Sequence, residues 1–117
     1  MKKIAHQIYK SIVHHTTWKK HLHEMIESGI VDEDFSEEVC EFGQWLKENA
    51  QELSSSEHYS KVTELHHRVH TEAQKIIALA LSGKREEALT AIAYGSEFEH
   101  TSQTLVQSII AWHDAVK

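Results

Sequence analysis

The chain has 117 residues, of which 40% are hydrophobic and 26% charged, with no proline and only four glycines. This length predicts one domain covering residues 1–117, and the scarcity of residues that interrupt regular structure nearly excludes an all-β fold. The formal net charge of −6 argues against a nucleic-acid partner, because a phosphate backbone requires a dense stripe of Lys and Arg.

Three further observations bear on location and chemistry. The longest apolar run, residues 76–81, is far shorter than the roughly 18 residues that cross a bilayer, so we expect no membrane insertion and a cytoplasmic protein. Cys40 is the only cysteine, which excludes an internal disulfide. Histidine is unusually abundant: eleven stand against twelve Lys and Arg together, and they supply many ligands for a borderline metal such as zinc.

Hydrophobic periodicity predicts four helices in chain order. Residues 2–28 carry apolar positions at alternating spacings of four and three and end at Gly29. A loop over 31–36, in which Asp34 or Ser36 provides a cap, precedes a second helix containing VCEFGQWLKENA. A third helix is expected over residues 57–81 and a fourth over 84–116, with a polar, kinked middle at residues 94–96. Four such segments predict an all-α, antiparallel four-helix bundle.

Two histidines lie on the apolar stripes themselves. His15 lies between Ile8 and Leu22 on the first helix, and His66 lies on the stripe of the third helix. His70 follows His66 by four residues, which places the two imidazoles on one helix face. With Cys40, the inward-facing donors number four, as a closed tetrahedral zinc site requires.

A histidine on an apolar stripe can also be a hydrogen-bonded core residue, and a lone cysteine can be simple packing. The other histidines are expected on the surface, with His14 and His67 as substitutes if the helix phase is off by one residue. This surface group comprises His6, His14, His21, His23, His58, His67, His100 and His113.

Three motifs give the chain a specific resemblance. His15-Thr16-Thr17-Trp18, Cys40-Glu41-Phe42-Gly43-Gln44-Trp45-Leu46 and His66-His67-Arg68-Val69-His70 resemble the H-x-x-W, C-x-F-G-x-W and H-x-x-x-H series of the chemoreceptor zinc-binding (CZB) domain. The resemblance implies a bacterial regulatory domain of receptors and diguanylate cyclases, an all-α bundle that often dimerises and binds Zn²⁺. By position it makes His15, Cys40, His66 and His70 the ligands. It also implies aromatic packing by Trp18 and Trp45.

The resemblance has consequences for output and mechanism. No effector domain is expected within these residues, so we expect a stand-alone member of the family. We also expect it to form a homodimer and to act on a receptor or signalling-enzyme partner. A closed four-ligand site has no open position for a substrate water, which favours sensing or structure over catalysis. Oxidation of Cys40 would weaken one ligand, and the family is implicated in sensing zinc and hypochlorous acid.

Two alternatives belong to other classes of protein. Glu-x-x-His occurs at Glu64–His67 and Glu97–His100, as in di-iron bundle enzymes, although at 100° per residue Glu64 and His67 point away from the stripe that holds His66. The chain could instead be a metal-free helical interaction module, paired through the exposed residues of the last helix.

Overall fold

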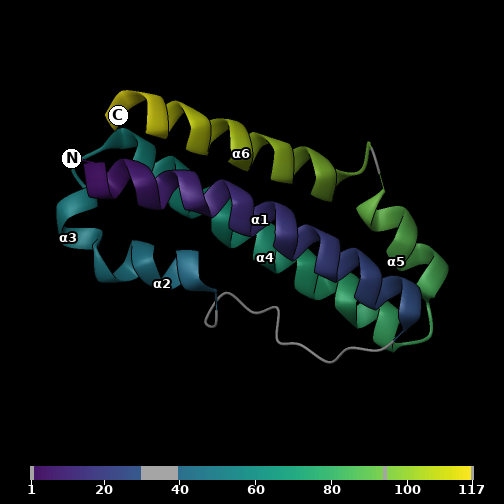
Figure 1. The fold of residues 1–117 in the computed structure, drawn as a ribbon. Helices are drawn as coiled ribbons and strands as arrows, with labels where there is room; N and C mark the ends of the chain where they lie inside the picture. The colour runs from purple at the N-terminus through teal and green to yellow at the C-terminus, as the bar shows by residue number, and fades with distance from the viewer. Residues whose placement is uncertain (1, 30–39, 94, 117) are drawn as a thin grey trace.

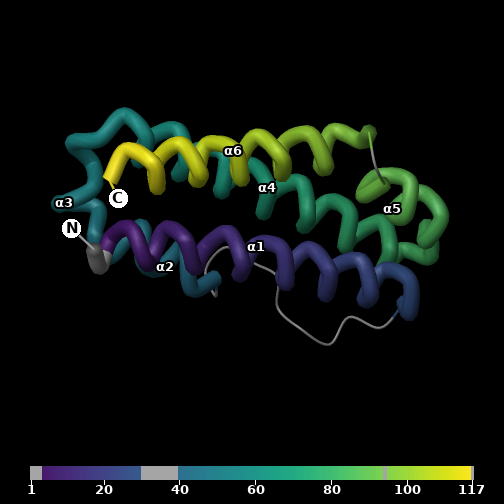
Figure 2. Tube along the Cα trace, turned by 45° about the horizontal axis from the view of Figure 1, so that its top comes forward, coloured from purple at the N-terminus to yellow at the C-terminus, as the bar shows by residue number. Residues whose placement is uncertain are grey.

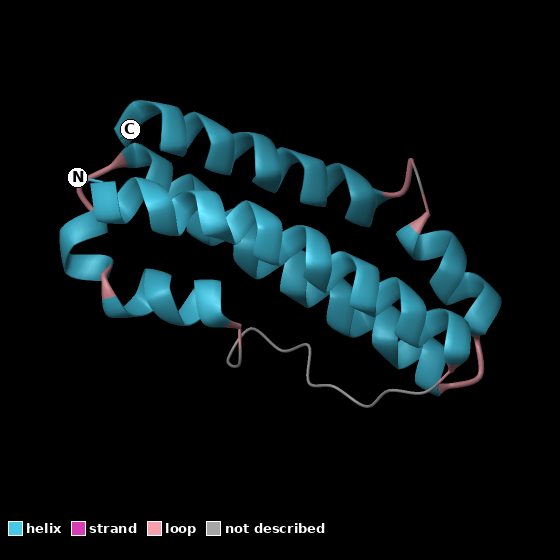
Figure 3. Cartoon of the chain, in the orientation of Figure 1, coloured by secondary structure: helices cyan, strands magenta, loops and turns pink. Residues whose placement is uncertain are grey.

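The computed structural model describes residues 2–29, 40–93 and 95–116, and within them every regular element is a helix (Figure 3). In chain order these are α1 (Lys2–Ser28), α2 (Glu41–Glu48), α3 (Ala50–Leu53), α4 (Glu57–Leu81), α5 (Arg85–Ile92) and α6 (Glu97–Val116).

The three long helices α1, α4 and α6 form the body of an elongated bundle (Figure 1). Helices α1 and α4 run in one direction, and α2 and α6 run in the opposite one, so the chain direction alternates from α1 to α2, α4 and α6. The short α2 and α3 cover one end of the bundle, and α5 lies at the other end (Figure 2). The predicted all-α bundle is therefore confirmed.

The core lies where the stripes of α1, α4 and α6 meet. Trp112, Leu105 and Ile109 of α6 are almost fully buried and pack with Ile8 and Leu22 of α1. Burial of such side chains contributes about 1.5–3 kcal/mol each, so these stripes supply much of the stability. Among the described residues, no helix has both the length and the apolar character needed to cross a bilayer.

Helix α4 has the bounds that the sequence predicts. The side chain of Ser56 caps its start by accepting a hydrogen bond from the backbone N–H of His58 at 3.2 Å. Past its end, Gly83 adopts a φ of 82°, a left-handed conformation that glycine enters without steric cost. The capping residues explain why this helix could be delimited from sequence.

The predicted fourth helix is two helices. Helix α5 ends at Ile92 and α6 begins at Glu97. Between them Gly95 adopts a φ of 89°, which a continuous α-helix does not permit, and the Ser96 hydroxyl accepts a hydrogen bond from the Glu99 N–H at 3.2 Å. The polar middle of this segment is therefore a break and a new start, rather than a kink.

The second helix is also shorter than predicted. Cys40 precedes α2 as its N-cap, with extended dihedrals of φ −77° and ψ 122°, and so lies just outside the helix. The helix ends at Asn49, whose side-chain amide donates to the Trp45 carbonyl at 2.9 Å. The predicted cap at Asp34 or Ser36 lies outside the described residues.

Candidate metal centre

A buried cluster of three metal-binding side chains lies between α2 and α4. One ligand atom from each of Cys40, His66 and His70 lies within 4.8 Å of the others, and all three side chains are buried. His66 and His70 come from successive turns of α4, while Cys40 enters from the start of α2. This is the only such group among the residues that the structure describes.

The distances suit a zinc ion. Sγ of Cys40 and Nε2 of His66 are 3.4 Å apart. Two ligands at Zn–S and Zn–N bond lengths around a tetrahedral ion lie about 3.6 Å apart, so little movement is needed. The rings of His66 and His70 are 4.6 Å apart between centroids, as expected for neighbours on one helix face.

Burial keeps the histidines in the form that binds metal. It lowers the pKa of His66 to about 3, with the neighbouring His70 as the next largest cause. Burial likewise lowers the pKa of His15 to about 4, followed by the charge of Lys19. Both imidazoles are neutral at neutral pH, which leaves one ring nitrogen of each with a lone pair.

His15, the fourth predicted ligand, is buried as expected but is directed differently. Its Nε2 forms a hydrogen bond of 2.7 Å with the Ser102 hydroxyl of α6. His15 lines the same small cavity as Cys40, His66 and His70, yet it falls outside the group of atoms within 4.8 Å. Three of the four predicted ligands are thus brought together, and the fourth borders them.

A comparison with known protein families found one match for this chain. The model of the chemoreceptor zinc-binding domain matches residues 15–77, a range that includes His15, Cys40, His66 and His70. The chain belongs to this family. No curated protein and no solved structure matches it. Zn²⁺ is the cofactor of CZB domains, and the buried thiol with two imidazoles provides the soft and borderline donors that zinc prefers.

Aromatic rings enclose the CZB site. The Trp18 ring lies 4.9 Å from that of His70 and 5.7 Å from that of His15, and Phe42 meets His66 edge-on at 5.3 Å. Trp45 packs one ring further out, against Phe42. These contacts exclude water and limit the rotamers of the histidines, so the site is largely formed by the fold.

The sequence predicts His14 on the surface, with a place at the site only if the helix phase is off by one residue, and the structure brings it to the border of this site. Its Nε2 lies 3.7 Å from Sγ of Cys40, and the side chain is half-buried. The signal that could have found it is the His14-His15 pair, because adjacent residues are 100° apart on a helix and both can border a site beside it. Of the other expected surface histidines, five are exposed and two half-buried; the exposed ones are His6, His21, His23, His67 and His100.

The di-iron alternative is wrong for this structure. Glu64 and His67 of α4 are exposed, and Glu64 pairs with Arg68 at 3.7 Å. Glu97 and His100 of α6 are exposed as well. A di-iron site needs carboxylates and histidines that project into the bundle interior, and these four residues face solvent.

Proposed function

We propose that this CZB protein is a zinc-responsive regulator in which the ion is held by Cys40, His66, His70 and a histidine of α1. The position of His15 in the H-x-x-W motif makes it the α1 ligand by family pattern. The observation that carries the proposal is the convergence of one buried thiol and two buried imidazoles within 4.8 Å.

Zinc at this site supplies a fixed positive centre that ties separate elements together. Its donors come from α1, from the residue before α2 and from α4, so binding restrains three parts of the chain at once. Four protein ligands leave no open coordination position, which favours a structural or sensory role over hydrolysis. Metal occupancy would then change the rigidity of the bundle, and a partner could respond to that change.

Cys40 makes the proposed regulator sensitive to oxidants. The metal-bound form of a cysteine is the thiolate, which hypochlorous acid converts to a sulfenic acid with release of chloride. Cys40 immediately precedes α2, so loss of its bond to zinc would release the start of that helix. We include oxidant sensing, homodimerisation and a cytoplasmic receptor or cyclic-di-GMP signalling partner in the proposal. The protein's membership of the CZB family supports these parts of the proposal.

A zinc titration tests the proposed site. Wild type, His66→Ala and His70→Ala, all without a His tag, compete with a chromophoric chelator for Zn²⁺. We expect one equivalent to bind to wild type and each substitution to weaken binding by at least about tenfold, because each removes a ligand. His100→Ala serves as the control, since His100 is exposed on α6 and lies outside the cluster. Equal binding by all four proteins would contradict the proposal.

A further inference from the structure

Helix α1 presents two adjacent imidazoles to the metal cluster. His14 and His15 both line the small cavity formed with Cys40, His66 and His70. A tetrahedral zinc ion that already has these three ligands needs one more donor. The structure thus offers two candidates for one coordination position.

His15 is already engaged elsewhere. Its Nε2 shares a 2.7 Å hydrogen bond with the hydroxyl of Ser102, which is almost completely buried on α6. In one tautomer Nε2 donates its proton to the hydroxyl, and in the other its lone pair accepts from it. Nε2 is therefore unavailable to a metal in either case while the contact with Ser102 persists, and Nδ1 lies outside the group of ligand atoms within 4.8 Å of one another.

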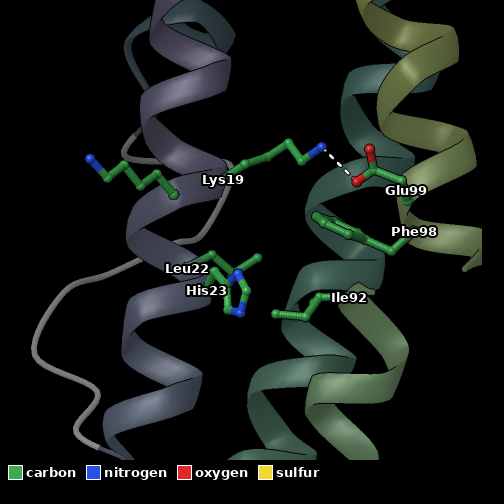
Figure 4. Close-up of a pocket in the computed structure, with 7 residues that line it drawn as sticks. Lys19, Leu22, His23, Ile92, Phe98 and Glu99 are labelled. Atoms are coloured by element: carbon green, nitrogen blue, oxygen red, sulfur yellow. Dashed lines mark hydrogen bonds and ion pairs between the residues drawn. The ribbon is translucent and has the colours of Figure 1, made fainter. Parts of the chain in front are cut away.

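A second contact fixes the register of α1 against α6 one turn further along. Nζ of Lys19 and Oε2 of Glu99 are 2.7 Å apart, and both side chains are largely shielded from solvent. Figure 4 shows this ion pair crossing from α1 to α6 above Leu22 and Phe98. Lys19 follows His15 by four residues and Glu99 precedes Ser102 by three, so the ion pair helps to keep His15 opposite Ser102.

His14 lies at a ligand-like distance from the sulfur. Its Nε2 is 3.7 Å from Sγ of Cys40, close to the separation of about 3.6 Å between sulfur and nitrogen ligands of tetrahedral zinc. Like His15, His14 lies outside the group of ligand atoms within 4.8 Å of one another, so either histidine must move to bind the ion. His14 also lines a second pocket, of about 70 Å³, with Lys10 and Glu41. The half-buried His14 thus connects the buried cluster with a pocket beside it.

We propose that His14 and His15 are alternative α1 ligands of the same ion, and that Ser102 sets the balance between them by holding His15. The inference rests on the proposed zinc site at Cys40, His66 and His70. His14 completes the coordination while His15 is bonded to Ser102, and His15 replaces it when that hydrogen bond opens. Ser102 is accordingly a positioning residue that links α6 to the metal.

A double-mutant cycle on α1 tests the alternation. Zinc affinity is measured by chelator competition for wild type, His14→Ala, His15→Ala and the double variant, and the coordination is followed in the visible spectrum of the Co²⁺-loaded proteins. Because each histidine can replace the other, each single substitution should weaken binding by less than about tenfold and keep a four-coordinate spectrum. The double substitution should weaken binding by more than about 100-fold. If one single variant binds zinc as weakly as the double variant and the other binds it as tightly as wild type, the alternation is wrong.

Ser102→Ala distinguishes the proposed role from simple structural support. In the His14→Ala background it should tighten zinc binding about threefold or more, because His15 is freed for the ion. In the His15→Ala background it should leave the affinity unchanged. Ser108→Ala, which alters another buried serine of α6, is the matched control and should have no effect in either background. Weaker binding in Ser102→Ala would mean that Ser102 orients His15 as a fixed ligand, which overturns the inference.

The two proposals fail in different ways. If His66→Ala abolishes zinc binding, and His15→Ala weakens it while His14→Ala does not, the zinc site is correct and the alternation is wrong. If wild type takes up no zinc, both proposals are wrong.

Discussion

The chemistry of this protein depends on polar residues that are buried without being charged. His66 is 4% exposed and its pKa is lowered to about 3, chiefly by burial, so protonation near neutral pH would place a charge where water cannot solvate it and next to His70. A neutral imidazole and a thiol are poor partners for the apolar core, but good ligands for zinc. The metal therefore offsets a local cost that the histidine cluster imposes on the fold.

At the residue scale, the oxidant response should depend on Cys40 alone. We expect one equivalent of hypochlorous acid to release zinc from wild type, because a sulfenic acid is a much weaker ligand than a thiolate. The release is followed with a chromophoric chelator, and thiol loss is checked by mass spectrometry. Cys40→Ser, loaded at the higher zinc concentration that it requires, should release no additional zinc on oxidation. Met25→Leu serves as the control for methionine oxidation, and its response should match wild type.

At the scale of elements, α2 is the segment most dependent on the metal. It is only eight residues long, buries Phe42 and Leu46, and is preceded by Cys40, whose side chain makes no capping hydrogen bond. Isolated helices of this length are unstable in water, so α2 depends on tertiary contacts and on the attachment of Cys40. By contrast α4 has 25 residues, a serine cap and eight buried side chains.

This difference between helices gives the site a fixed half and a more easily released half. His66 and His70 are held on α4 whether or not the ion is bound, since the helix is part of the core. The thiol is held by an element whose own contacts are few. A change in metal occupancy should therefore be transmitted through α2 rather than through α4.

At the scale of the whole molecule, zinc should stabilise the bundle as a unit. The clustered donors lie just before α2 and on α4, and the proposed fourth lies on α1; the packing of these elements with α6 forms the core, so the unfolded chain cannot offer the same site. Zinc at about 1,000 times its dissociation constant would add about 4 kcal/mol.

We therefore expect zinc to raise the melting temperature by roughly 10–20 °C, given the usual entropy of unfolding for a domain of this size. Circular dichroism melts with excess Zn²⁺ and with a chelator measure the shift. His66→Ala should show a much smaller shift, whereas the exposed variant His100→Ala should behave like wild type. A wild-type melting temperature that is unchanged by zinc would show that the ion does not link these helices.

The amino-acid sequence determined the helical class, the stripes of α1 and α4, and the bounds of α4. These features depend on local physics: apolar spacing, a serine cap and a glycine with positive φ act within a few residues of one another. The spacing of His66 and His70, and their burial with Cys40, followed from the same stripes and motifs.

Only the tertiary structure decided how α1 meets the site. His14 and His15 are adjacent in sequence, so periodicity could favour one face but could not set distances to side chains from other elements. The Ser102 hydroxyl that bonds His15 lies 87 residues away, and the sulfur near His14 lies 26 away. Contacts of this range arise from the packing of whole helices, which a local pattern does not contain.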